Sequence, residues 1–357
     1  MADQKFIFIQ LRGGMDGLAA LKPDDDSVLK ARRPDLLAGK YLTTKEGFAF
    51  NPALKNHHQM FQNKELSFMH ACGLPVQDRS HFKSQDLLQT GSLDANARQG
   101  WLAQILEKMH RSKEGVAFGP TLPLIYAGTQ KAFEWSSPRI VSDDEALMKM
   151  LGTMLYKDDP ILGELYPQFK RLENLTGGFN RDNRSANPFE IIGNLLSQKD
   201  GPDIGVINLG NWDTHDNQNA RIAKEFQNLD DGLGTLRSKM KKVWDDTVIV
   251  VASEFGRSVH QNGTDGSDHG TGGVCMIAGG AVDGGRSLGA WPGLESGDLF
   301  EDRDVMPVHD IRTIFANIAD AHLSMKAGLI KDIFAKLPAG YDEIPIVKRK
   351  KRLFGFV

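Results

Sequence analysis

Residues 204–252 read IGVINLGNWDTHDNQNARIAKEFQNLDDGLGTLRSKMKKVWDDTVIVVA, and their pattern sets the fold class. The stretch opens and closes with short apolar runs, Ile204 to Leu209 and Thr247 to Ala252, which are typical of buried strands. Between them, apolar side chains recur at alternating steps of four and three residues, as in an amphipathic helix: Ile222, Phe226, Leu229, Leu233, Leu236, Met240 and Val243. Strand, long helix and strand in this order predict an α/β fold with a largely parallel sheet covered by helices.

Further short apolar runs predict strands on both sides of this unit. They are Lys5 to Leu11, Leu66 to His70, Leu122 to Ala127 and Gly273 to Ala278. We therefore expect a single domain over residues 1–357. The segment of about 152–197 mixes aromatic and polar residues with few strand-like runs, so we interpret it as a helical insertion or cap that overhangs the crevice. Residues 348–357 form a basic tail.

The composition excludes several classes of protein. The formal net charge is -3, so a broad basic field for nucleic acid or an anionic membrane is absent, and a small molecule is the expected partner. No apolar run approaches the roughly 18 residues of a membrane span, which predicts a soluble chain. Two cysteines exclude a disulfide framework and an iron–sulfur site. We expect a cytoplasmic protein if Met1 is the native start, and a periplasmic one if a signal peptide has been removed.

Acidic and imidazole side chains cluster next to the expected strands. Six of them are candidate metal ligands: Asp16, Asp213, His215, Glu254, Asp268 and His269. Because ligands of such sheets bind at the carboxyl ends of the strands, we expect these residues to share one crevice. Carboxylates about 4 Å apart repel by roughly 4 kcal/mol at an effective dielectric near 20, a cost that a cation relieves. One or two divalent ions are expected, Zn²⁺ or Mn²⁺ if imidazoles dominate, and Mg²⁺ or Ca²⁺ if carboxylates do.

Each of these residues also has a structural explanation. Asp and Gly are common beside strand ends, and Asp16 on its own would more often be a turn residue or a helix N-cap. The segment RSHFKSQD, residues 79–86, looks like a helix start with Ser80 near the N-cap. Ser80 then either only caps that helix, with His81 directed to solvent, or it is a nucleophile activated by the helix dipole and a metal. Three arginines, Arg12, Arg79 and Arg257, are candidates to grip the oxygens of a tetrahedral anion.

Together these motifs resemble the DUF1501 family, an uncharacterised group placed in the alkaline phosphatase and sulfatase superfamily. The matching segments are LRGGMDGL at 11–18, RSHFKSQD at 79–86, NWDTHDNQ at 211–218, SEFGR at 253–257, SDHGTGG at 267–273 and AWPGL at 290–294. The resemblance covers most of the chain, and the motifs occur in the family's order.

The resemblance implies a three-layer α/β/α sandwich and a metal-assisted nucleophile that attacks phosphorus or sulfur. It would make Asp16 a metal ligand after the first strand and Ser80 the nucleophile. Asp213, His215 and His269 would serve one metal position, and Glu254 a second one shared with Asp16. Two features differ from the superfamily pattern: Glu254 and Phe255 stand where alkaline phosphatases have an Asp-His pair, so one imidazole is missing, and Ser80 lacks the sulfatase C/S-x-P-x-R context.

Our first hypothesis is a metal-dependent hydrolase of phosphate or sulfate esters, acting on a small molecule or a sugar ester. A second hypothesis is a binding or assembly protein that keeps the scaffold without the chemistry. A third is a transferase that moves the phospho or sulfo group to another alcohol. The metal, the ester, the oligomeric state and the natural substrate stay open at this point.

Overall fold

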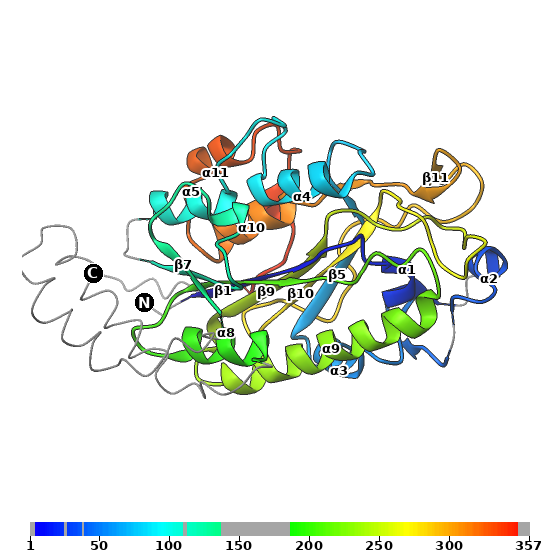
Figure 1. Cartoon of the computed structure of the whole chain (residues 1–357), viewed down its shortest axis with the longest axis horizontal. Helices are drawn as coiled ribbons and strands as arrows, with labels where there is room; N and C mark the ends of the chain where they lie inside the picture. Colours follow the sequence, from blue (N-terminus) through cyan, green and yellow to red (C-terminus); the bar gives the residue numbers. More distant parts are fainter. Residues whose placement is uncertain (1–3, 25–26, 38, 110–112, 137–185, 349–357) are drawn as a thin grey trace, which may run out of the picture.

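The main feature of the computed structural model is an eight-stranded sheet between two layers of helices (Figure 1). The structure describes residues 4–24, 27–37, 39–109, 113–136 and 186–348. In strand order, the sheet contains β13 (His309–Asp310), β5 (Leu66–Gly73), β10 (Gly273–Ala278), β9 (Thr247–Ser253), β1 (Lys5–Leu11), β8 (Ile204–Leu209), β6 (Gly115–Phe118) and β7 (Ala132–Trp135). Only β10 runs antiparallel to its neighbours in this sheet, so the predicted largely parallel α/β/α architecture is confirmed.

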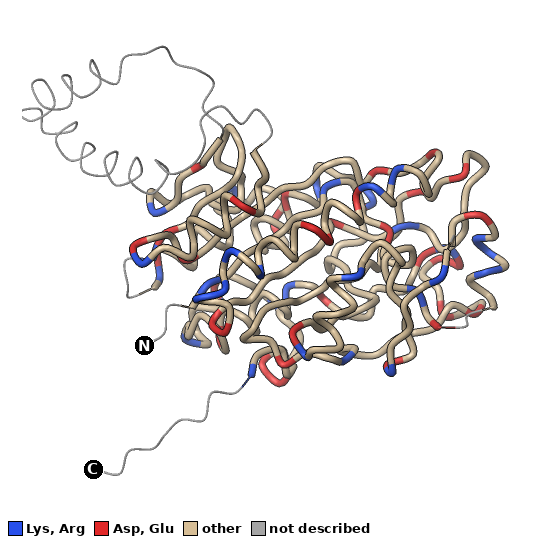
Figure 2. The backbone as a smooth tube through the Cα atoms, turned by 90° about the horizontal axis from the view of Figure 1, so that it is seen from below, with Lys and Arg blue, Asp and Glu red and all other residues tan. Residues whose placement is uncertain are grey.

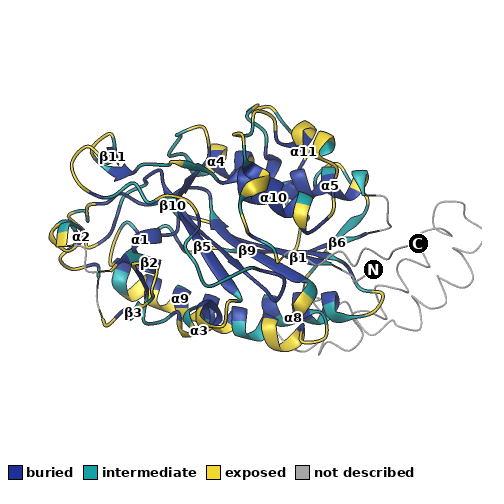
Figure 3. Cartoon of the chain, turned by 180° about the vertical axis from the view of Figure 1, so that it is seen from behind, coloured by how far each residue is buried: buried dark blue, intermediate teal, exposed yellow. Residues whose placement is uncertain are grey.

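The central strands are buried on both faces because alternate residues enter two different cores. Phe6 and Phe8 of β1 belong to one hydrophobic cluster, and Ile7 and Ile9 belong to the other. The first core lies under α4 (His81–Thr90), α5 (Trp101–Lys108), α10 (Arg312–Ala321) and α11 (Ala327–Ile333). The second lies under α3 (Lys55–Gln62), α8 (Pro188–Ser197) and α9 (Gln218–Lys239). Figure 3 shows the buried strands between these helices, whose outer faces are exposed.

The predicted βαβ unit is present, but its two strands are not neighbours in the sheet because a third strand lies between them. Helix α9 begins at Gln218 and ends at Lys239, and it connects β8 to β9. Strand β1 lies between these two strands and pairs in parallel with both. The first strand of the chain therefore occupies the middle of the sheet, and the loops after β1, β8 and β9 leave from the same edge.

The remaining described elements are short. They are α1 (Gly17–Ala20), β2 (Leu21–Pro23), α2 (Ser27–Arg32), β3 (Leu42–Thr43), β4 (Phe48–Phe50), β11 (Leu299–Phe300), β12 (Asp304–Val305) and the 3-10 helices η1 (Leu124–Tyr126), η2 (Trp244–Asp246) and η3 (Tyr341–Glu343). Strands β2, β4 and β3 form a small antiparallel sheet. None of the described helices is long and apolar enough to cross a membrane. Figure 2 shows acidic and basic residues interspersed along the backbone.

One predicted strand is wrong. Residues Leu122 to Ala127 form no strand but contain η1, whose N-cap is Pro123. Proline has no N–H to donate to a sheet ladder, and a short apolar run does not by itself distinguish a strand from a helical turn. In the central sheet, β6 and β7, with four residues each, and β13, with two, were not predicted, because such short strands leave little pattern in the sequence.

The insertion and the tail fall largely outside the described residues. Of the predicted insertion at 152–197, residues 152–185 lie outside them, and the last ten residues form α8, which packs against α9 and β8. Of the basic tail, 349–357 also lies outside, whereas the Lys348 ammonium donates to the Gly280 carbonyl at 2.7 Å. The single-domain interpretation stays a prediction.

Candidate metal centre

The loops at the carboxyl ends of the central strands bring a group of acids and imidazoles together. Asp213 and His215 follow β8, Glu254 follows β9, and Asp268 and His269 precede β10. A sixth member was not predicted: His81, the first residue of α4, enters the cluster from the loop after β5.

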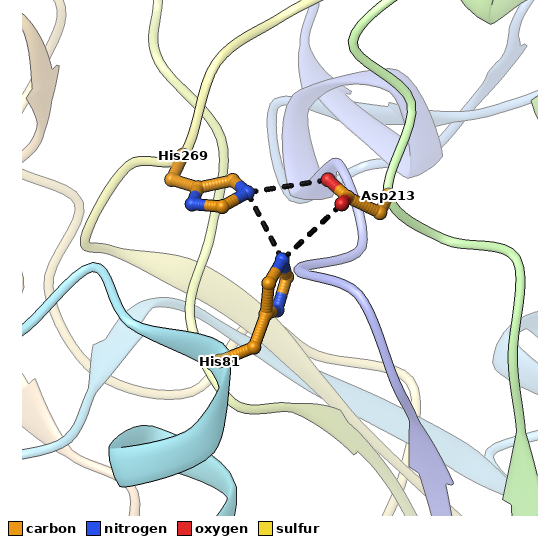
Figure 4. Close-up of side chains that lie close together, drawn as sticks. All are labelled: His81, Asp213 and His269. Carbon is orange, nitrogen blue, oxygen red and sulfur yellow. Dashed lines mark hydrogen bonds and ion pairs between the residues drawn. The ribbon is translucent and has the colours of Figure 1, made fainter.

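Three imidazoles meet through the same ring atom, Nε2. The Nε2 atom of His269 lies 2.9 Å from that of His81 and 3.0 Å from that of His215. The Asp213 carboxylate lies against all three: its Oδ1 is 3.0 Å from His215 Nε2 and 3.2 Å from His269 Nε2, and its Oδ2 is 3.4 Å from His81 Nε2. Figure 4 shows His81, at the start of α4, and His269, in the loop before β10, directed at Asp213. His269 and Asp213 thus each contact both His81 and His215.

The other ring nitrogen, Nδ1, has a hydrogen-bond acceptor in each of the three cases. His81 Nδ1 lies 2.7 Å from Glu254 Oε1, His215 Nδ1 lies 3.2 Å from Asp268 Oδ1, and His269 Nδ1 lies 3.0 Å from the Arg79 carbonyl. Carboxylates and carbonyls only accept, so Nδ1 carries the hydrogen, and in a neutral ring Nε2 then presents a lone pair. Three lone pairs and a carboxylate facing one another require a cation or a proton between them.

This arrangement fits a divalent metal ion. Ligand atoms of His81, Asp213 and His269 all lie within 4.8 Å of one another. Metal-bound histidines almost always donate their second ring N–H to a carboxylate or a carbonyl, which fixes the ring orientation. Nitrogen-rich sets completed by one carboxylate are typical of Zn²⁺ and related ions. Asp213 and His215 are 45% and 43% exposed, so an ion and a substrate have access from solvent.

The pKa values of the cluster show how its charges compensate. The hydrogen bond to Glu254 raises the pKa of His81, whereas burial and the nearby His81 lower the pKa of His269. Burial alone would raise the pKa of Asp213, but the Arg257 guanidinium and the neighbouring imidazoles outweigh it and hold the value at about 2. Burial likewise opposes ionisation of Glu254, and hydrogen bonds from His81 and Gln85 bring its pKa below the usual range.

Glu254 orients other groups of the cluster. It is buried, and its Oε1 accepts from His81 Nδ1, from Gln85 Nε2 at 2.9 Å and from the Gly13 amide at 2.9 Å. These three donors fix the position of the Glu254 carboxylate. Glu254 in turn holds the His81 ring by accepting from Nδ1, on the side away from Nε2. His81 of α4 thus places an imidazole beside Glu254, where the next residue in the sequence is Phe255.

Asp16 is placed outside this cluster. Its carboxylate caps α1 by accepting from the amides of Leu18 and Ala19, and it also binds Arg33 Nη1 and Gln218 Nε2, both at 2.6 Å. The side chain is fully buried among these donors. The capping explanation of Asp16 thus describes its contacts, and the metal-ligand role expected from the resemblance gains no support from them.

Two of the three arginines are bound to internal partners. Arg79 forms ion pairs with Asp304 at 2.7 Å and Glu301 at 2.6 Å. Arg257 is buried and donates to Asp213 Oδ1 at 2.5 Å. It also donates to the backbone carbonyls of Gly13, Gly14, Trp212 and Ser267. Arg257 therefore ties three loops of the cluster together, and only Arg12, which is exposed and contacts Gln85, remains turned toward solvent.

Ser80 lies beside the cluster without touching it through a described side-chain hydrogen bond. It occupies the N-cap position of α4, yet among the described residues its side chain makes no cap hydrogen bond. Its amide is held by Asp78 Oδ1 at 3.1 Å. Ser80 immediately precedes His81 in the sequence, so both residues lie at the start of α4.

His81 was missed because its direction depends on how α4 joins β5. A histidine one residue after an N-cap is equally compatible with a position in solvent, which was the alternative that the sequence left open. The signal that could have found it is the absence of an imidazole after Glu254 combined with the histidine in RSHFKSQD.

One family model matches the chain. It is described as DUF1501, protein of unknown function, and it matches residues 181–334. That range contains NWDTHDNQ, SEFGR, SDHGTGG and AWPGL, whereas LRGGMDGL and RSHFKSQD, with Asp16 and His81, lie outside it. No match is found among curated protein sequences.

Several solved structures are similar at low identity. An alkaline phosphatase from the Antarctic bacterium TAB5 is 12% identical with a TM-score of 0.37, over 78% of this chain and 92% of that one. Ps i-CgsB in complex with k-i-k-neocarrahexaose is 12% identical with a TM-score of 0.37, over 77% of this chain and 65% of that one. The lipoteichoic acid synthase LtaP from Listeria monocytogenes is 14% identical with a TM-score of 0.37, and this chain again spans 65% of its length.

At these TM-scores the three likenesses carry no argument about the activity of this chain. The family model stands independently of them and agrees with four of the six quoted motifs. The resemblance to DUF1501 is thereby confirmed: over residues 181–334, this chain matches that family.

Proposed function

We propose that this chain is a metal-dependent hydrolase of phosphate or sulfate esters. The observation that carries the proposal is the meeting of three imidazole Nε2 atoms and the Asp213 carboxylate, each imidazole being oriented through Nδ1 by a separate acceptor. The resemblance of the motifs supplies the class of reaction.

The residues that would hold the ion are His81, His215 and His269 through Nε2, and Asp213 through its carboxylate. Glu254 and Asp268 would keep their imidazoles in the binding tautomer by accepting from Nδ1. A bound Zn²⁺ or Mn²⁺ supplies Lewis acidity, which stabilises the charge that develops on an ester oxygen. The three imidazoles favour these ions over Mg²⁺ or Ca²⁺, which prefer oxygen ligands.

Ser80 is the proposed nucleophile. Its hydroxyl lies at the start of a ten-residue helix, where the partial positive charge of the helix end favours an anionic oxygen. In the first step Oγ forms a bond to phosphorus or sulfur while the bond to the alcohol oxygen breaks, and the hydroxyl proton leaves with the alcohol. In the second step water cleaves the new bond, which restores the serine and releases the inorganic acid.

Arg12 is the proposed anchor for the non-reacting oxygens of the ester. It is exposed, and Gln85 accepts from its Nε at 2.9 Å, so its terminal nitrogens can extend toward a ligand. Arg257 serves the same site indirectly, because it fixes Asp213 and the carbonyls of three neighbouring loops.

The first experiment separates metal binding from chemistry. The purified full chain is dialysed, and its metal content is measured by elemental analysis for the wild type, His269→Ala and His260→Ala. His260 is exposed and serves as the matched control. We expect about one equivalent of a divalent transition metal in the wild type and the control, and little in His269→Ala.

The second experiment tests the reaction. Hydrolysis of aryl phosphate and aryl sulfate esters is followed for the wild type and Ser80→Ala, and we expect Ser80→Ala to lose turnover while it keeps the metal. Turnover retained by Ser80→Ala would remove the serine from its role. A chain that binds metal but cleaves neither ester would instead be a binding or assembly protein, and product formed only with an acceptor alcohol would identify a transferase.

A further inference from the structure

Gln218, the last residue of the segment NWDTHDNQ, is a buried amide outside the group of candidate ligands. It is the first residue of α9, and its side chain is fully buried at the point where this helix reaches the metal centre. A buried amide must have all of its polar atoms satisfied, so its partners show what it holds in place.

The amide of Gln218 has three buried partners. Its Nε2 donates to Asp16 Oδ2 at 2.6 Å. Its Oε1 accepts from the hydroxyl of Thr214 at 2.9 Å and from the hydroxyl of Ser267 at 2.6 Å. The three partner side chains are themselves fully buried, so water does not compete for these bonds.

The two hydroxyls belong to the two loops that carry the cluster. Thr214 stands between Asp213 and His215, and Ser267 directly precedes Asp268 and His269. The backbone amide of Ser267 also donates to the Thr214 carbonyl at 3.2 Å. The amide oxygen of Gln218 therefore bonds to both the loop after β8 and the loop before β10, beside this backbone hydrogen bond.

Asp16 fixes the orientation of this amide. An ionised carboxylate only accepts, so it faces Nε2 and leaves Oε1 directed at the two hydroxyls. Asp16 is held in turn by Arg33 Nη1 at 2.6 Å, and the guanidinium of Arg33 also donates to the carbonyls of Ser258 and Val259. Arg33 thus fixes Asp16, and Asp16 fixes the orientation of the Gln218 amide.

We propose that Gln218, oriented by Asp16, is a positioning residue that sets the distance between the two ligand-bearing loops and so determines the affinity of the centre for its metal. This inference rests on the proposed metal site. It gives Asp16 a function in that site that differs from the ligand role expected from the resemblance. Groups that hold the ligands of a metal in place typically change its affinity 10- to 100-fold when they are replaced.

The test is a metal titration of the full chain, with a spectrum as a second readout. Metal-free wild type, Gln218→Leu and Gln227→Leu are titrated with Co²⁺, whose visible absorption depends on ligand geometry, and Zn²⁺ affinity is measured by competition with a chelator. Gln227 lies on the same helix, is exposed and bonds only Asp231 among the described residues, so its variant is the matched control.

We expect Gln218→Leu to bind Zn²⁺ at least 10-fold more weakly and to show an altered Co²⁺ spectrum, with the control unchanged. Circular dichroism of the metal-free proteins separates this effect from unfolding. If Gln218→Leu does not fold, Ser267→Ala and Thr214→Val decide, because each removes one hydroxyl and leaves the amide in place. Each should weaken Zn²⁺ binding by about 3-fold or more.

Wild-type affinity and an unchanged spectrum in the folded Gln218 variant, or in both hydroxyl variants, would overturn the positioning role while the metal site stands. A wild-type chain that binds neither Co²⁺ nor Zn²⁺ would overturn the proposed function, and this inference with it.

Discussion

The pair His57 and Asp230 and the pair His81 and Glu254 have the same local geometry in different surroundings. In both, the imidazole Nδ1 lies 2.7 Å from a carboxylate oxygen. The first pair joins α3 to α9 and is buried in the protein. The second joins the start of α4 to the end of β9 and opens toward the cluster.

The two pairs differ at the second ring nitrogen. Among the described residues, Nε2 of His57 has no hydrogen-bond partner, whereas Nε2 of His81 meets His269 and Asp213. A carboxylate therefore orients the imidazole in each place, but only the second place gathers several ligand atoms. A histidine–carboxylate pair is by itself a packing device, and the convergence of further Nε2 atoms makes it a candidate metal centre.

The strongest way to break this comparison is to remove each imidazole in turn. We expect His81→Ala to weaken Zn²⁺ binding by at least about a thousand-fold, equal to about 4 kcal/mol. The metal loses one imidazole ligand, and that ligand is one that Glu254 holds in the binding orientation. His57→Ala should leave the affinity unchanged and lower only the stability of the fold. Both are measured by chelator competition and urea unfolding. Equal affinities for the two variants would show that His81, like His57, only packs.

A second prediction sharpens the role of the carboxylate behind the metal centre. Glu254→Gln keeps the size of the side chain but removes the charge that holds the proton on His81 Nδ1. We expect Zn²⁺ affinity to fall about thirty-fold, equal to about 2 kcal/mol, within the range observed for such supporting groups. The control is Glu190→Gln, an exposed glutamate paired with Lys239 on α9. An affinity within two-fold of wild type in both variants would contradict the orienting role of Glu254.

Most of the central sheet was predictable because its strands are short apolar runs with both faces buried. Strands β1, β8 and β10 have the bounds predicted for them, and β9 ends one residue later than predicted. The exception at Leu122 to Ala127 has a local cause in Pro123. The order of strands was not predictable, since β1 enters between β8 and β9 through contacts distant in sequence.

The site was predictable only as far as strand ends determine it. Asp213 and His269 follow from the rule that loops at one edge of a sheet converge, and the structure brings them together. Asp16 also follows a strand at this edge of the sheet, but its carboxylate is bound by Arg33 and Gln218. Neither of these contacts can be predicted from the sequence. His81 depends on the angle at which α4 leaves β5, which only the packed structure specifies.

The smallest predicted effect concerns the buried pair alone. Asp230 accepts from the amides of Asn56 and His57 as well as from the His57 ring, and so it holds the start of α3 against α9. Asp230→Asn keeps the shape but loses the charge, and we expect a loss of about 1.5 kcal/mol in the free energy of unfolding at neutral pH, as for a hydrogen bond to a charged group. Urea unfolding measures it. Asp231→Asn is the exposed neighbour that should change little.

The difference in unfolding free energy between wild type and Asp230→Asn should depend on pH, and the pKa of Asp230 predicts in which direction. Burial opposes ionisation of Asp230, but hydrogen bonds from His57 and the two amides outweigh it and lower its pKa in the folded state. A lowered pKa contributes stability that is present above the unfolded value of about 3.9 and is lost as the pH falls through the folded value. The gap between wild type and Asp230→Asn should therefore be present at pH 5 and close as the pH falls from about 3.9 through the folded-state pKa of Asp230. The metal-centre histidines are common to both proteins and cancel in this difference. A gap that does not narrow as the pH falls below the unfolded value of about 3.9 would mean that Asp230 stabilises the fold by shape and not by charge.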